Sequence, residues 1–228
     1  MKHIIFAIIS ILLTGNVLAA DNDPVAEYIN DAADNDVTIK IPDGFKARKL
    51  DGDKELVINP GFHTRLQLPD GSIGWIYQII LESTDGNCAI LMPIAFFKPG
   101  TVTALGTHVK TEIKASQNDI HCDLKKHLNL ITGPDMSRYS MADTAAVYPL
   151  NMSTPYMGKY NNCTGIYLRK FAHPAMIIKI LMTDNGLAHK EKYLKTLFDS
   201  ITYGNTPSET GILSEKNDFN RIGGLLPL

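Results

Sequence analysis

The sequence lacks a surplus of charge of either sign. It holds 22 Lys and Arg residues against 24 Asp and Glu residues, which gives a formal net charge of -2 at pH 7. Nucleic acids and anionic membrane surfaces attract proteins through clustered positive charge. Because the chain has no basic excess, its composition supports neither nucleic-acid binding nor attachment to an anionic membrane.

Cysteine is also scarce. The chain of 228 residues contains only Cys88, Cys122 and Cys163. Disulfide-dependent scaffolds carry many cysteines in much shorter chains, so this fold must depend on a hydrophobic core. Three cysteines allow one disulfide with one free thiol, or no disulfide at all, and the sequence does not choose among the possible pairings.

The short motifs that identify many catalytic sites are absent as well. The sequence has no Gly-x-Ser-x-Gly, no glycine-rich phosphate loop, no His-Glu-x-x-His and no Cys-x-x-Cys. Each of these patterns fixes the geometry of a nucleophile, a phosphate site or a metal site. Their absence favours a non-catalytic protein, and we predict neither a cofactor nor a metal.

The N-terminus carries the pattern of a secretory signal peptide. Lys2 precedes an apolar run over residues 4–13, and small side chains follow at Val17 and Ala19. The run is too short to span a membrane, but a basic end, an apolar run and a small-residue cleavage site are typical of export. We expect a signal peptide over residues 1–19, a single domain over 20–204, a polar tail over 205–228, and a periplasmic or secreted protein without a membrane span.

Apolar spacing predicts three helices and at least six strands. The helices are expected after the Asp23-Pro24 cap, over residues 120–131, and over residues 187–200. The predicted strands cover residues 37–41, 73–81, 88–97, 144–150, 163–170 and 175–182. Because the strands follow one another between isolated helices, we expect an α+β domain with a mostly antiparallel sheet flanked by helices.

Two strands carry more specific expectations. Alternation over residues 73–81 places Trp75, Tyr77, Ile79 and Leu81 on one face of a single strand. Pro93 has no backbone N–H to donate, so the next strand is expected at a sheet edge or beside a bulge.

The two ends of the expected domain resemble a known family. Residues 41–45, Ile-Pro-Asp-Gly-Phe, follow the first predicted strand, and the chain closes with strand 176–182, a turn, helix 187–200 and the sequence Ile-Thr-Tyr. These segments resemble the PsbP/Mog1-like α/β/α sandwich, whereas residues from about 105 to 155 show no pattern of that family. The resemblance implies a compact adaptor or binding domain and assigns no site residues.

One cluster contains the residue types of a zinc site or a thiol nucleophile. Its members are His108, His121, Cys122, Asp123 and His127. On the predicted helix His121 and Cys122 point about 100° apart, and His127 is five residues beyond Cys122, so neither histidine shares a face with the thiol. We therefore expect a structural or disulfide-bonded Cys122. An envelope hydrolase that uses Cys122 with His121 or His127 is the alternative.

Tyrosines gather in and around a long loop near residues 151–161. Those predicted to bind are Tyr148, Tyr156 and Tyr160, because an exposed tyrosine offers a large contact area with a polar tip. The leading hypothesis is an exported, non-catalytic binding or adaptor domain that recognises a protein or a cell-envelope component through residues 152–162. The identity of that partner and the oligomeric state do not follow from the sequence.

Overall fold

The computed structural model describes residues 23–56, 64–67, 73–93, 105–131, 138–170 and 173–205. The expected signal peptide and the tail after residue 205 lie outside these ranges. In chain order the elements are α1 (Pro24–Ala33), β1 (Val37–Ile39), β2 (Phe45–Lys49), α2 (Gly52–Glu55), β3 (Arg65–Gln67), β4 (Ile73–Trp75), β5 (Tyr77–Ser83), β6 (Cys88–Pro93), α3 (Leu105–Gln117), the 3-10 helix η1 (Leu124–Lys126), β7 (Asn129–Ile131), β8 (Thr144–Leu150), β9 (Asn162–Arg169), β10 (Met176–Met182), α4 (Asp184–Leu187), α5 (Lys190–Ser200) and β11 (Ile201–Tyr203).

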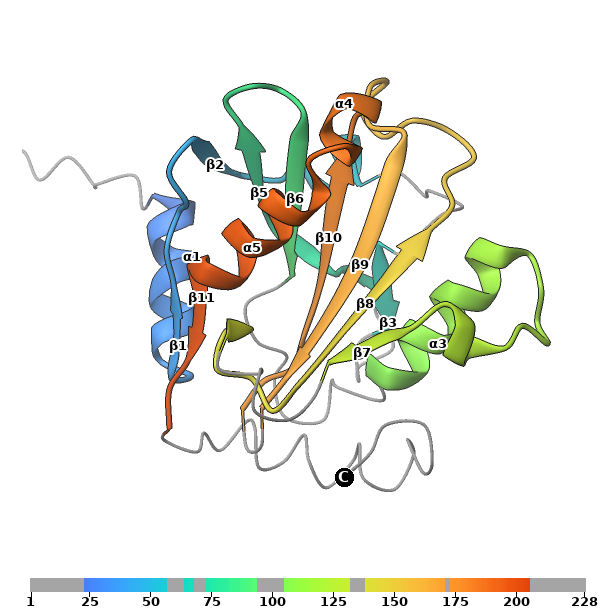
Figure 1. Cartoon of the computed structure of the whole chain (residues 1–228). Helices are drawn as coiled ribbons and strands as arrows, with labels where there is room; N and C mark the ends of the chain where they lie inside the picture. Colours follow the sequence, from blue (N-terminus) through green and yellow to red (C-terminus); the bar gives the residue numbers. More distant parts are fainter. Residues whose placement is uncertain are drawn as a thin grey trace, which may run out of the picture.

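One antiparallel sheet organises the described chain. Seven strands form it in the order β2-β5-β6-β10-β9-β8-β7, and every neighbouring pair is antiparallel (Figure 1). Two short ladders, β1 with β11 and β3 with β4, lie outside it. Side chains of α1 and α5 pack on one face, and those of α3 on the other. The expected α+β domain, with an antiparallel sheet flanked by helices, is therefore confirmed.

The central strand β10 shows why the sheet needs cover on both faces. All seven of its residues are buried. Met176, Ile178, Ile180 and Met182 face α1 and α5, as the alternation predicted, whereas Ile177 and Leu181 face the side of α3. None of the helices in the described ranges is long and apolar enough to cross a membrane.

The helices at the two ends follow their sequence signals. Asp23 caps α1, because its side chain accepts a hydrogen bond from the Val25 backbone N–H at 3.0 Å, and Pro24 occupies the first turn. The helix expected over 187–200 is divided into α4 and α5. Gly186 brings α4 close to the β5–β6 turn, since a Cβ there would lie 2.2 Å from the carbonyl oxygen of Asn87.

The helix predicted over residues 120–131 is wrong. The helix of this region is α3, which ends before Asn118, a residue with a left-handed φ of 51°. The segment after it turns because Asp119 accepts from the His121 N–H and Asp123 from the Lys125 N–H. Short polar side chains compete with helical hydrogen bonds in this way. The apolar spacing survives as separate contacts of η1 and β7 with the core.

The single strand predicted over residues 73–81 is also corrected. The register shifts between Tyr77 and Ile79, opposite Pro93 and Met92. As a result Tyr77 faces α3, whereas Ile79 and Leu81 face α1 and α5. Of the two alternatives that Pro93 predicted, the sheet edge is wrong, since β6 lies between β5 and β10, and the bulge is present. The bulge rotates the aromatic side chain to the opposite face.

A buried ion pair joins α3 to the centre of the sheet. The Lys179 Nζ of β10 donates to the Glu112 Oε2 of α3 at 2.6 Å, and both side chains have 0% exposure. The Tyr148 hydroxyl donates to the same oxygen at 3.0 Å. Tyr148 lies against Gly165 of β9, where a Cβ would be 2.2 Å from the ring. The glycine thus makes room for the tyrosine that completes the network.

This pair yields a stability prediction. Glu112→Leu leaves the Lys179 ammonium buried without its carboxylate, so we expect a loss of about 3–5 kcal/mol in the free energy of unfolding, measured in urea. The double variant Glu112→Leu with Lys179→Met removes both charges and should recover most of that loss. Glu191→Leu, at an exposed helical glutamate, is the control and should cost less than about 1 kcal/mol. Equal losses in the single and double variants would contradict this account.

Candidate functional site

An open groove lies between α5 and the β7 edge of the sheet. It has a volume of about 840 Å³ and is lined by residues of η1, β7, β8 and α5, together with Arg138 and Tyr139. Figure 1 shows α5 crossing the middle of the sheet, with no described helix in front of β7 and β8. The last two strands therefore have one face that none of the described helices covers. A hollow of this size is typical of a ligand-binding site.

The floor of the groove is apolar. On β8, Ala145 and Val147 face the same side as α5, and Pro149 follows at an exposed position. From α5 come Leu194 and Phe198, while Ile131 and Tyr139 complete the apolar lining. The Tyr139 and Phe198 rings meet edge to face with centroids 4.8 Å apart. Val147 and Pro149 of β8 line the hollow, and the Tyr139–Phe198 pair bounds it.

The rim of the groove is basic. Lys126, Arg138, Lys190 and Lys195 line it, against the two carboxylates Glu191 and Asp199. Lys195 forms an ion pair with Asp199. Within the described ranges, Lys126, Arg138 and Lys190 have no ion pair. The groove thus carries local positive charge on a chain whose formal net charge is -2.

The lining of the groove combines an apolar floor with charged side chains. No Ser, Thr or Cys side chain belongs to the residues that line the groove, so a covalent nucleophile of those types is absent from the described lining. The apolar floor can hold a hydrophobic group, and unpaired cations on the rim can bind anions. Sequence reasoning missed these cations because they come from three separate segments that only the fold brings together.

The tyrosines predicted to bind are not exposed, and that expectation is corrected. Exposure is 0% for Tyr148, 5% for Tyr156 and 0% for Tyr160. Tyr148 lies beneath α3 in the ion-pair network, and burial raises the pKa of all three hydroxyls. The sequence did not predict this burial, because the residues around a tyrosine follow the same alternating pattern whether its side chain is half-exposed or buried. Their role is packing.

Tyr156 and Tyr160 hold the tip of the loop in place. Each backbone N–H donates to the carbonyl of the other residue, at 2.9 and 3.0 Å. Between them Met157 and Gly158 adopt left-handed φ values of 50° and 72°. Met157 is 46% exposed. The tip and the residues on either side of the tyrosine pair, such as Ser153 to Pro155 and Asn161, face solvent. Recognition by residues 152–162 stays a prediction.

The Cys/His cluster does not converge. His121 is exposed, Cys122 is half-buried, and His127 lines the groove. No hydrogen bond joins Cys122 to either histidine. The side chain of His108 lies outside what the structure describes. Among the described residues, no group of three or more His, Cys, Asp or Glu side chains is placed to hold a metal ion.

All three cysteines are free thiols. Burial raises the pKa of the Cys163 thiol to about 12 and that of Cys88 still further. At neutral pH both are protonated and enclosed. The structural cysteine expected at position 122 packs at the margin of the core beside α3.

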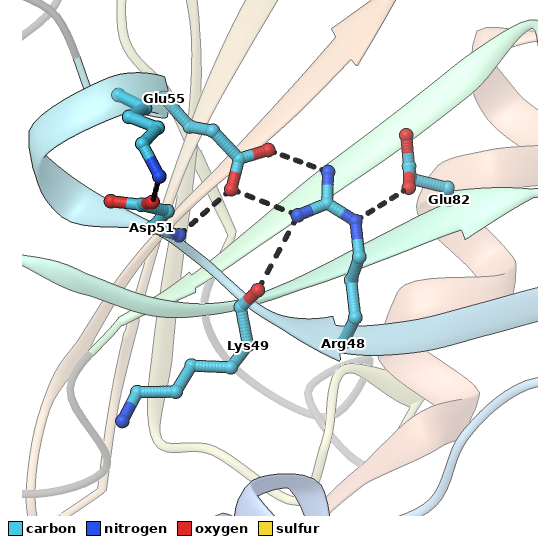
Figure 2. Close-up of polar contacts among 6 residues, drawn as sticks. Arg48, Lys49, Asp51, Glu55 and Glu82 are labelled. Carbon is cyan, nitrogen blue, oxygen red and sulfur yellow. Dashed lines mark hydrogen bonds and ion pairs between the residues drawn. The ribbon is translucent and has the colours of Figure 1, made fainter.

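A second cluster of charged residues lies near the loop, and its side chains are paired with one another. Figure 2 shows the Arg48 guanidinium between Glu55 and Glu82. It donates two hydrogen bonds to the Glu55 carboxylate, at 2.6 and 2.8 Å, and one to Glu82 at 3.1 Å. These bonds raise the pKa of Arg48 and lower that of Glu55. The cluster ties α2 to β2 and β5, and we assign it to structure.

Comparisons with known proteins identify no family for this chain. No protein-family model matches the sequence, and no curated protein matches it significantly. The solution structure of cyanobacterial PsbP (CyanoP) from Synechocystis sp. PCC 6803 matches with a TM-score of 0.35 and 10% sequence identity, over 75% of this chain and 88% of that chain. The match assigns no function to any residue.

Burial of the tyrosines yields a prediction about the loop. Tyr160→Ala removes a fully buried ring, so we expect a loss of about 3–5 kcal/mol in the free energy of unfolding. Tyr160→Phe keeps the ring and should cost less than about 1.5 kcal/mol. Urea unfolding monitored by circular dichroism measures both. An alanine variant as stable as the parent would mean that the ring lies at the surface.

The thiols can be counted by reaction with Ellman's reagent at pH 8. Raised pKa values and burial predict that Cys88 and Cys163 do not react in the native protein, whereas Cys122 reacts at an ordinary rate. After denaturation all three should react. Cys122→Ser should abolish the native reaction. Rapid native reaction in that variant would contradict the burial of the other two thiols.

Proposed function

We propose that this chain is an exported, non-catalytic binding or adaptor domain, and that it holds its partner in the groove between α5 and β7–β8. The observation that carries the proposal is the set of three unpaired cations, Lys126, Arg138 and Lys190, placed around an apolar floor. Charged side chains cost conformational entropy to order, and here they have no partner within the described chain. A bound anionic partner would supply the negative charges that pair with them.

Several features of the chain support binding over hydrolysis. The groove offers contact area and charge, and its described lining contains no Ser, Thr or Cys. Cys122, the nucleophile of the alternative hydrolase, has no hydrogen bond to a histidine in the part of the chain that the structure describes. A nucleophile needs a base within hydrogen-bond reach and a third group that orients the base. We therefore favour the adaptor and leave the hydrolase aside.

Site-specific crosslinking tests the proposal. The photoreactive residue p-benzoylphenylalanine is placed at Pro149, in the groove, and at Thr202, on β11, with the full chain produced in its source organism. We expect a discrete crosslinked product at Pro149 and none at Thr202. Adding Lys126→Glu and Lys190→Glu should remove most of the product, because reversed charge repels an anionic partner.

Lys192→Glu is the matched control for that experiment. It reverses one charge in the first turn of α5, as Lys190→Glu does, but Lys192 does not line the groove. The product should persist in this variant. The proposal is wrong if Pro149 gives no product, or if the product is equally strong with and without the groove cations.

A further inference from the structure

The cations of the groove lie toward two opposite ends of it. Lys190 begins α5, whereas Arg138 adjoins Tyr139, whose ring contacts Phe198 near the other end of the helix. Eight residues separate Lys190 from Phe198, which corresponds to about 12 Å along a helix that rises 1.5 Å per residue. The positive charge is therefore spread along the groove.

The strands beneath α5 show at which end of the groove Arg138 and Lys126 lie. The Ala142 N–H donates to the Tyr139 carbonyl, so the start of β8 lies with Arg138. Val147, at the middle of β8, pairs with Asn129 at the start of β7, and because the two strands are antiparallel the chain before Asn129 continues toward the far end of β8. Lys126 thus belongs to the end of the groove that is remote from Arg138. The apolar floor lies between these two sources of charge.

We propose that the occupant of the groove is an extended peptide segment with two carboxylates four residues apart and an apolar side chain midway between them. This rests on the proposed function of the groove. In an extended chain alternate side chains point to one side and each residue advances about 3.3 Å, so positions i and i+4 are about 13 Å apart on the same face. That span matches the distance along α5, and position i+2 faces the floor.

The spread of charge favours a peptide over a lipid. A phospholipid or a free phosphate presents one compact anion, which is best held by cations that converge on a single point. Here the unpaired cations are divided between the ends, and Lys195, which lies on α5 between Lys190 and Phe198, is already paired with Asp199. Glu191, beside Lys190, also disfavours a multiply charged headgroup at that end. Two single carboxylates match the rim better.

Fluorescence anisotropy of labelled peptides tests this proposal. The probe is acetyl-Glu-Thr-Val-Thr-Glu carrying fluorescein, and the full chain is the titrant. Two comparison peptides have the same label, whose charge is therefore common to all three: Glu-Glu-Thr-Val-Thr, with adjacent acids, and Gln-Thr-Val-Thr-Gln, without acidic side chains. We expect the spaced acidic probe to bind about tenfold more tightly than either, and its binding to weaken as salt rises.

Variants at both ends make the test specific. Lys190→Glu and Arg138→Glu should each weaken the spaced probe about tenfold, whereas Lys192→Glu should leave it unchanged. Unfolding midpoints equal to the parent show that the variants fold. Equal binding of the spaced and adjacent acidic peptides would overturn the proposal.

Vesicles separate the lipid alternative from the peptide. The same variants are mixed with vesicles of phosphatidylcholine and phosphatidylglycerol. Binding that both Lys190→Glu and Arg138→Glu abolish, without any binding of the acidic probe, would replace the peptide with an anionic lipid. If the Pro149 crosslink forms but neither probe binds, the groove is a binding site and the occupant is wrong. If the crosslink also fails, the proposed function is wrong.

Discussion

The burial of the sheet on both faces is the constraint on which the rest of the structure depends. A strand such as β10 has no side that can face water, yet it carries Lys179 at its centre. That charge can remain there only because Glu112 of α3 meets it. The position of α3, the tyrosine that completes the hydrogen bonds and the glycine that admits the tyrosine follow from this requirement. The buried Lys179 thus requires that α3 cover this face of the sheet.

The opposite face shows what happens where cover is incomplete. Packing of α1 and α5 buries the middle of the sheet, while β7 and β8 extend beyond α5. Val147 and Pro149 of β8 line that margin, and the aromatic pair of Tyr139 and Phe198 closes one side of it. The groove therefore forms because the sheet is wider than the part of it that α5 covers. The cations that line the groove come from three separate segments of the chain.

Local signals allowed much of the fold to be predicted. The cap at Asp23, the alternation in β10 and the proline bulge at Pro93 each act over a few residues, so their sequence patterns identify them. The segment over 120–131 was misassigned, because its Asp side chains satisfy the backbone in turns while its leucines keep a helical spacing. Burial of Tyr160 and the meeting of cations at the groove depend on contacts distant in sequence. A local sequence pattern does not indicate such contacts.

The Lys179–Glu112 pair also has a consequence for how this sequence can change over time. An isolated charge in the core costs about 3–5 kcal/mol, which is a large part of the 5–15 kcal/mol that holds a typical domain together. A lineage that replaced one partner would pass through a form close to unfolding before the second replacement arrived. The two positions are therefore expected to stay together or to change together, so that homologous sequences should show them as a covarying pair.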